Sequence, residues 1–251
     1  MRNNDKIVGL EKDRLVDGAS GIDRGDIFIT RTKEVPVEGY SIIRQAIGKI
    51  IAETRSNLRI TDYGSFKLHN GDYGSPDWYQ GQALTGSDKG FGQQVDAVGI
   101  DRLLRSEPYQ RDHPHYDVMV VDKDLRTDSD DNNFVYGIGS FPNVVLSTRR
   151  FMNIRDTNDR LASLANLAAH ELGHVLGLTH RSWNRGTSGM CVGHCAGEKG
   201  PCLMEQVDVP GQRTAVKQAR KVIVRENWLC EDCTEEIEMR RKAILNLGLR
   251  W

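Results

Sequence analysis

One stretch of the sequence decides the fold, HELGHVLGLTH, which runs from His170 to His180. It ends a helix that the apolar spacing predicts over Asn158–Leu176. Residues four apart lie on one face of a helix, so His170 and His174 can bind one metal ion together. Glu171 directly follows the first histidine and can reach a metal-bound water without being a ligand itself.

The third histidine requires a break in this helix. His180 lies six residues beyond His174, and on a continuous helix it would point away from the other two. Gly177 supplies the break, because glycine adopts left-handed conformations at low cost at helix C-termini. Three neutral imidazoles leave one position of a tetrahedral zinc ion open to water, which is the arrangement of a catalytic site. We therefore predict a catalytic zinc ion on His170, His174 and His180. Glu171 is then the general base that takes a proton from zinc-activated water.

The cysteines form a second group of candidate metal ligands in the last quarter of the chain. They are Cys191, Cys195, Cys202, Cys230 and Cys233. A disulfide framework would usually connect more of the chain and use an even number of cysteines. Cys230 and Cys233 form a C-x-x-C knuckle, whose turn brings two thiolates to one side as zinc requires. A redox pair would need a strand-to-helix context that the sequence does not predict. Structural zinc is therefore favoured over a redox pair or free buried cysteines.

Length and composition limit the remaining possibilities. The chain has 251 residues, enough for one domain, or for one domain split into two lobes around a cleft. Its formal net charge of -1 gives no reason to expect nucleic-acid binding. No apolar run approaches the roughly 20 residues that a bilayer span needs, and Met1–Asp17 lacks the apolar stretch of a secretory signal. We expect a cytoplasmic protein without a membrane partner, and no pattern indicates an oligomeric state.

Apolar patterns elsewhere alternate between strand and helix periodicity, which is typical of α/β folds. Predicted strands cover Asp26–Thr30, Leu58–Thr61, Asp117–Val121, Phe134–Ile138 and Asn143–Ser147. Further predicted helices cover Tyr40–Glu53, Phe91–Leu104, Gln212–Asn227 and Thr234–Asn246, the last with Thr234 as its N-cap. Residues 62–90 and 122–133 are predicted to be loops, and residues 1–24 a polar arm.

The histidine stretch matches H-E-x-x-H-x-x-G-x-x-H, the metzincin signature. Metzincins also have a methionine turn beneath the zinc, for which Cys202-Leu203-Met204 offers Met204. The final C-x-x-C narrows the resemblance to the archaemetzincins, whose C-x-M element and C-x-x-C contribute to a second, four-cysteine zinc site. The chain departs from that family at Arg181, where a cysteine is usual, and in a glycine-rich insertion over Ser182–Pro201. The segment from Met204 to Cys230 is also longer than usual.

The resemblance implies an α/β fold with a mixed sheet, that is, a metzincin-like zincin fold with an active-site helix. Residues 25–251 would be one catalytic domain, with an upper lobe over 25–177 and a smaller, mostly helical lower lobe over 178–251. The upstream similarity lies in Asp117–Asp122, Asn133–Gly139 and Val144–Phe151, which resemble the family's central strand, its F-V-(F/Y)-G segment and its edge strand. By the same resemblance, Asn143–Thr148 would be the edge strand that pairs with an extended peptide.

The resemblance also implies one catalytic and one structural zinc ion. The structural ion would bind Cys195, Cys202, Cys230 and Cys233, with Cys191 or His194 as alternatives to Cys195. The predicted function is a zinc-dependent peptidase acting on a peptide or protein substrate. The alternatives are a zinc hydrolase of a non-peptide amide, a zinc-stabilised module that binds peptides without cutting them, and histidines that merely stabilise a helix.

Overall fold

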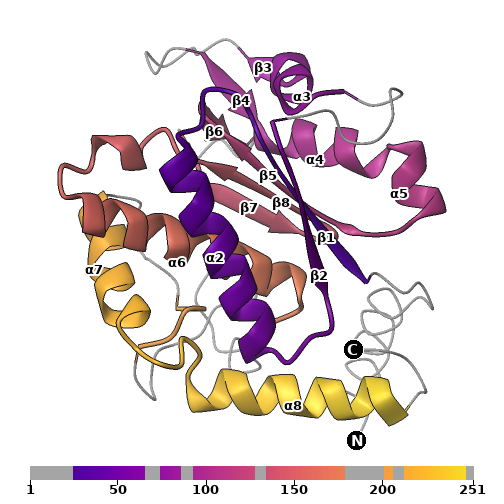
Figure 1. Ribbon diagram of the computed structural model, residues 1–251, viewed down its shortest axis with the longest axis vertical. Coiled ribbons are helices and arrows are strands. Elements are labelled where there is room, and N and C mark those ends of the chain that lie inside the picture. Colours follow the sequence, from indigo (N-terminus) through magenta and orange to yellow (C-terminus); the bar gives the residue numbers. More distant parts are fainter. Residues whose placement is uncertain are drawn as a thin grey trace, which may run out of the picture.

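The computed structural model of the protein describes residues 25–65, 74–85, 93–127, 134–178, 201–205 and 212–246. These residues form an α/β fold around a mixed five-stranded sheet (Figure 1). The fold class predicted from the sequence is therefore confirmed. The predicted polar arm over residues 1–24 lies outside the described residues.

The large sheet consists of β1 (Asp26–Arg31), β2 (Arg59–Gly64), β5 (Tyr116–Val121), β7 (Gly137–Ser140) and β8 (Asn143–Ser147). Its strand order is β2-β1-β5-β8-β7. All neighbours are parallel except β7 and β8, which pair antiparallel. Every residue of β8 is buried, as expected for an interior strand of a sheet with both faces covered.

Two long helices cover one face of the sheet, α2 (Val37–Glu53) and α6 (Thr157–Val175). The apolar residues of α2 recur at helical spacing and are buried against Val118 and Val120 of β5, in one continuous core. Asp156 caps α6, because its side chain accepts a hydrogen bond from the backbone N–H of Asp159 at 2.8 Å. This packing fixes the helix that carries the candidate histidines.

Short elements cover the other face. They are the helices α3 (Pro76–Gln82), α4 (Ala97–Arg105) and α5 (Pro108–Asp112), and a small sheet of β3 (Leu84–Thr85), β4 (Gln94–Asp96) and β6 (Asp124–Arg126). Met119 and Val121 of β5 point into this second core, because side chains alternate along a strand. The sheet thus separates two hydrophobic clusters, and the candidate histidines belong to the side of α2 and α6.

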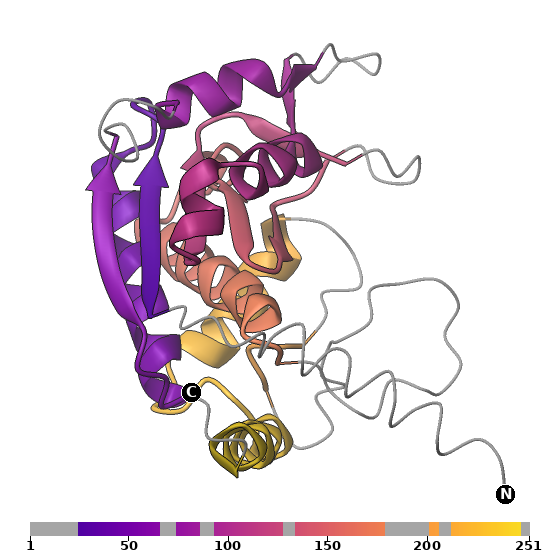
Figure 2. The same ribbon diagram turned by 90° about the vertical axis from the view of Figure 1, so that its right-hand side faces the viewer.

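The described C-terminal part is helical, with α7 (Gln212–Ile223) and α8 (Glu231–Asn246). Helix α7 packs on α6, whereas α8 lies at one end of the molecule, below the sheet in both views (Figures 1 and 2). Residues 202–204 and 228–230 are buried and extend the first core toward α8. A short 3-10 helix, Phe151–Asn153, links β8 to α6.

The structure corrects several predicted elements. The predicted loop over residues 62–90 contains α3 and β3, and the predicted loop over 122–133 contains β6. The predicted helix Phe91–Leu104 begins only at Ala97, because Gln94–Asp96 pair with β6 and the Asp96 side chain caps the helix. A short polar strand that pairs only through tertiary contacts leaves little trace in the local pattern.

Two further corrections concern the functional elements. The predicted edge strand, Asn143–Thr148, is wrong, since β8 pairs with β5 on one side and β7 on the other. The antiparallel edge strand is β7, which begins at Gly137 and not at Phe134. The last helix begins at Glu231, so Thr234 is not its N-cap, and the Thr234 hydroxyl instead donates to the Cys230 carbonyl at 2.9 Å. Helix α7 ends at Ile223, before the predicted Asn227.

Among the described residues, no helix combines the length and the apolar character that crossing a membrane would require.

Candidate metal centre

The last turns of α6 bring two histidine rings together. The Nε2 atoms of His170 and His174 lie 3.1 Å apart, and the rings are nearly perpendicular. The Nδ1 atom of His170 lies 2.8 Å from the carbonyl oxygen of Leu203, so this nitrogen carries the proton in the neutral ring. Its Nε2 atom then offers a lone pair toward His174. Two convergent imidazole nitrogens are a donor set that fits a zinc ion.

Burial affects the charge state of this site. It lowers the pKa of His170 below its ordinary value, although the hydrogen bond to Leu203 opposes the shift. A neutral ring is the form that binds metal. Burial also raises the pKa of Glu171 to about 7, while a hydrogen bond from the backbone of Gly139 opposes that shift. A carboxyl group with this environment, next to a candidate ligand, can exchange a proton near neutral pH.

The edge strand β7 contacts this part of α6 through two glycines. A Cβ atom at Gly139 would overlap the carbonyl oxygen of Glu171 and lie 3.1 Å from the Cβ of His174. A Cβ atom at Gly137 would lie 3.2 Å from the Cγ of Glu171. Glycines therefore allow the strand to approach the helix closely, and the glutamate lies directly beneath an edge strand.

The helix ends where the sequence predicts a break. Gly177 has a φ of 79°, in the left-handed region. The N–H of Leu178 donates to the Gly173 carbonyl at 2.9 Å, and the N–H of Gly177 donates to the His174 carbonyl at 3.0 Å. These two bonds form a Schellman motif, which turns the chain away from the helix axis. The break at Gly177 is confirmed, whereas His180 lies outside the described residues.

The predicted methionine lies against the same helix. Met204 is buried, and a Cβ atom at Gly173 would lie 2.5 Å from its sulfur. The residue before it, Leu203, supplies the carbonyl that accepts from His170. Segment 202–204 therefore makes a polar contact with α6 at His170 and an apolar contact at Gly173. These two positions flank Glu171 in the sequence.

Three of the predicted cysteines also converge. The sulfur atoms of Cys202, Cys230 and Cys233 lie within 4.8 Å of one another, and all three residues are buried. The sulfur of Cys202 lies 3.5 Å from that of Cys233 and accepts a hydrogen bond from the Cys230 N–H at 3.4 Å. Buried thiolates without a cation would be strongly disfavoured, so this donor set fits a structural zinc ion. The candidate fourth ligands, Cys195 with Cys191 and His194 as alternatives, lie outside the described residues.

Comparison with known proteins supports the fold. No family model and no curated protein sequence matches the chain. Solved structures do match it. The archaemetzincin of Methanopyrus kandleri has a TM-score of 0.55 at 20% identity, over 86% of this chain and 95% of its own. The archaemetzincin of Archaeoglobus fulgidus, in complex with malonate, has a TM-score of 0.51 at 20% identity, with coverages of 84% and 99%.

A zinc-dependent peptidase from Methanocorpusculum labreanum has a TM-score of 0.50 at 16% identity, covering 84% of this chain and 99% of its own. The chain has an archaemetzincin-like fold. At these identities the likeness concerns the fold, and it confirms the resemblance inferred from the histidine stretch and the C-x-x-C motif.

Within the archaemetzincin-like fold, two contributors to the site were not predicted from sequence. The Leu203 carbonyl is a backbone group, and its partner His170 lies 33 residues away, so no side-chain motif could indicate it. The sequence did contain an indication of the close approach at Gly137 and Gly139, because isolated glycines in a strand often mark positions where another backbone comes near.

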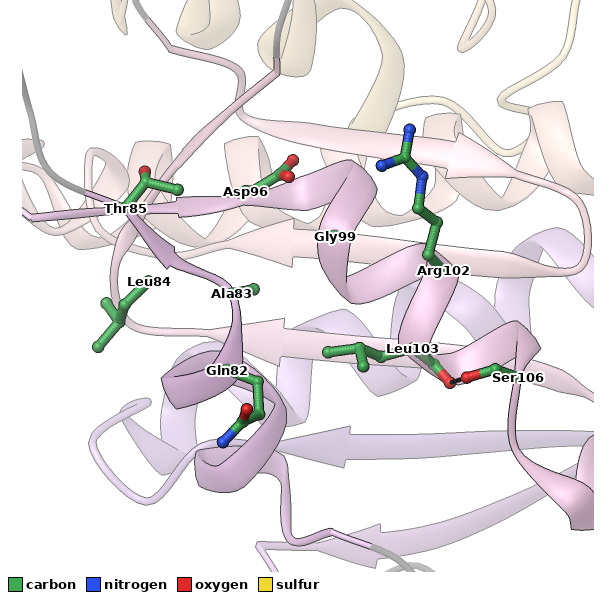
Figure 3. Close-up of a pocket in the computed structure, with 9 residues that line it drawn as sticks. All are labelled: Gln82, Ala83, Leu84, Thr85, Asp96, Gly99, Arg102, Leu103 and Ser106. Atoms are coloured by element: carbon green, nitrogen blue, oxygen red, sulfur yellow. Dashed lines mark hydrogen bonds between the residues drawn. The ribbon is translucent and has the colours of Figure 1, made fainter.

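A surface hollow at α3 and α4 lies on the other face of the sheet from the candidate histidines (Figure 3). Its lining comprises Gln82, Ala83, Leu84, Thr85, Asp96, Gly99, Arg102, Leu103 and Ser106. None of these is a predicted site residue, and the hollow is on the side of the second hydrophobic cluster. We do not assign the candidate chemistry to it.

Proposed function

We propose that this chain is a zinc-dependent peptidase whose catalytic ion is held by His170, His174 and His180. The observation that carries the proposal is the 3.1 Å approach of two imidazole Nε2 atoms beside the partly buried Glu171. The archaemetzincin-like fold supports it, since one similar solved structure is described as a zinc-dependent peptidase. Zinc would supply a Lewis acid that polarises the substrate carbonyl and acidifies a water molecule.

His170 has an orienting role in this proposal. Its Nδ1–H donates to the Leu203 carbonyl at 2.8 Å, which selects the tautomer whose lone pair is on Nε2. His174 follows one helical turn later, so the two nitrogens converge without any rearrangement of the backbone. This arrangement of the two rings supports the proposal that they bind one ion.

Glu171 would be the general base. Its carboxylate takes a proton from the attacking water and returns it to the nitrogen of the departing amine. The backbone N–H of Gly139 orients the carboxylate from above. The near-neutral pKa of this group favours both steps, because the base must gain and then lose the proton at one pH.

An extended peptide would bind along β7. This strand pairs with β8 on one side, and its other edge pairs with no strand among the described residues. Free backbone groups at a sheet edge can bind a peptide by β-augmentation. Because Gly137 and Gly139 bring β7 onto Glu171, a peptide on this edge would lie beside the candidate base, with its scissile carbonyl toward the proposed zinc site.

The second zinc ion would have a structural role, with Cys202, Cys230, Cys233 and, as the proposed fourth ligand, Cys195. Cys191 and His194 are the alternatives for that fourth place. Four protein ligands leave no open position, so such an ion stabilises the fold and does not bind substrate. The proposed metal content is two zinc ions per chain.

Substitution of the base tests the proposal. We expect Glu171→Gln to lower peptide turnover by about 10²–10⁴-fold, the usual contribution of a general base, with zinc content unchanged. The matched control is Glu34→Gln, an exposed carboxylate in the segment between β1 and α2, which should keep parent activity. The assay is cleavage of a peptide library, with elemental analysis of zinc.

Three results would overturn the proposal. Equal turnover by Glu171→Gln and the parent would remove Glu171 as the base. A zinc-loaded parent that binds peptides without cutting any of them would instead support a peptide-binding module, and cleavage of non-peptide amides alone would support a different hydrolase.

A further inference from the structure

One tripeptide contacts both clusters of candidate ligands. Cys202 contributes its sulfur to the three-cysteine cluster. Leu203 contributes its carbonyl oxygen to His170 at 2.8 Å. Met204 packs its thioether against Gly173, between the two histidines in sequence. Each residue of this tripeptide is buried, so none of the three contacts can loosen without disturbing the others.

The position of the Leu203 carbonyl depends on its surroundings on the cysteine side. The N–H of Leu203 donates to the Trp228 carbonyl at 2.8 Å. The N–H of Trp228 donates to the carboxylate of Glu53, at the end of α2, at 3.0 Å. Two residues later, the N–H of Cys230 donates to the sulfur of Cys202. Segments 202–204 and 228–230 thus form one unit, held together on both sides of Leu203.

We propose that Leu203 is a positioning residue that couples the two metal sites. Metal binding by the cysteine cluster holds the tripeptide in place, the Leu203 carbonyl then fixes the His170 ring, and the fixed ring binds the catalytic ion more tightly. This inference rests on the proposed function only for the identity of the catalytic ion. It adds an energetic link between two sites that the sequence presents as separate motifs.

General energetics give the size and the symmetry of this link. Hydrogen-bond partners behind a ligating histidine typically change metal affinity by about 10–100-fold. Coupling between two binding sites is reciprocal, so an ion on the histidines must raise the affinity of the cysteines by the same factor. A cysteine cluster that only stabilised the fold would give neither result at temperatures where the protein remains folded.

The experiment measures zinc affinity at each site. Metal-depleted protein is titrated with Zn²⁺ against a chromophoric chelator, and with Co²⁺, whose thiolate and imidazole complexes have different absorption spectra. We expect Cys233→Ser to lose the thiolate site and to weaken the histidine site by about 10–100-fold. We expect His174→Ala to lower the affinity of the cysteine site by the same factor, relative to the parent with both sites available.

A second readout follows the histidine directly. In ¹⁵N spectra of the imidazoles, Cys233→Ser should shift the Nδ1 signal of His170, because the hydrogen bond to Leu203 weakens. The control is Leu125→Ala, which creates a cavity in the hydrophobic cluster on the other face of the sheet. That variant should be less stable and yet keep the parent zinc affinity and the parent His170 signal.

If Cys233→Ser does not fold, Gln218→Ala replaces it. The Gln218 amide donates to the Cys202 carbonyl at 2.8 Å, so its loss loosens the tripeptide while leaving all three thiols. We expect a smaller weakening of the histidine site and a shifted His170 signal. Unchanged affinity and an unchanged His170 signal in folded Cys233→Ser or Gln218→Ala would overturn the coupling. Failure of the proposed function is distinct, since it would appear as tight, coupled zinc binding in a parent that cleaves no peptide.

Discussion

The histidine pair and the cysteine cluster are assembled in different ways. His170 and His174 belong to one helix, and their spacing alone places them on one face. The three sulfurs come from two segments of the chain, with Cys202 lying 28 residues before Cys230. The first arrangement is local and needs only α6, whereas the second exists only when the tertiary fold brings the segments together.

This difference predicts different consequences of metal binding for stability. A helix that packs against α2 and the sheet keeps its histidines close with or without an ion. The cysteine segments are held only by contacts between distant parts of the chain, because residues 201–205 and 224–230 form no regular secondary structure. An ion on the cysteines should therefore contribute to folding, while an ion on the histidines should contribute mainly to chemistry.

The largest expected effect is the loss of stability when the cysteine cluster is disrupted. Cys233→Ser should lower the free energy of unfolding by on the order of 4 kcal/mol, the size expected when a bound metal is lost. His174→Ala should cost less, since it removes only the stabilisation by an ion bound to an already formed helix, and alanine favours that helix. Urea unfolding of zinc-saturated proteins gives both values.

Removal of metal provides the control for that prediction. A strong chelator should destabilise the parent about as much as Cys233→Ser does, and should have little further effect on the variant. Equal losses for the histidine and cysteine variants would show that the two clusters contribute alike, against our interpretation.

A smaller effect is expected where the tripeptide meets the helix. A Cβ atom at Gly173 would lie 2.5 Å from the Met204 sulfur, and overpacking of this kind costs about 1–3 kcal/mol. Gly173→Ala should therefore be destabilising, although alanine is the better helix former. Gly48→Ala in α2 is the matched control, because its Cβ atom would make an ordinary 3.7 Å contact with Ile60.

The control should change stability in the opposite direction. Gly48→Ala is expected to stabilise the protein by up to about 1 kcal/mol, the helix propensity difference between the two residues. Combining Gly173→Ala with Met204→Ala should recover part of the loss, and thermal unfolding of the single and double variants measures this coupling. A Gly173→Ala variant as stable as Gly48→Ala would rule out the close approach of Met204.

The smallest expected effect concerns the turn at Gly177 that ends α6. Gly177 has a φ of 79°, which costs a residue with a Cβ atom roughly 1–2 kcal/mol. Gly177→Ala should lower the free energy of unfolding by that amount, because it strains the turn after His174. Gly177→Asn should cost less, since asparagine tolerates this conformation better. Equal losses for the two variants would argue against strain at this turn.

Much of the candidate site could be predicted from local patterns. The helix predicted over Asn158–Leu176 is found at Thr157–Val175, and the break at Gly177 is where the glycine places it. The C-x-x-C knuckle was also interpreted correctly as bringing two sulfurs to one side. These features depend on helical spacing and on short turns, which the sequence encodes within a few residues.

Other features could not be predicted because they depend on pairing partners. β8 has the more apolar sequence and resembled the substrate strand, yet it is interior, and the glycine-containing β7 forms the edge. The division into an upper and a lower lobe stays a prediction, as do the roles of His180 and Cys195, which lie outside the described residues.

The sequence by itself determined the helix that carries the candidate histidines, the pair of histidines on one face, the glycine that ends the helix and the archaemetzincin-like fold. Only the tertiary structure decided which strand lies over Glu171, which carbonyl holds His170 and how Cys202 joins Cys230 and Cys233. The physical reason is the distance along the sequence over which each kind of interaction acts. Helical periodicity and left-handed turns act over a few residues, whereas strand order and the hydrogen bond from His170 to Leu203 are settled by packing between segments far apart in the chain.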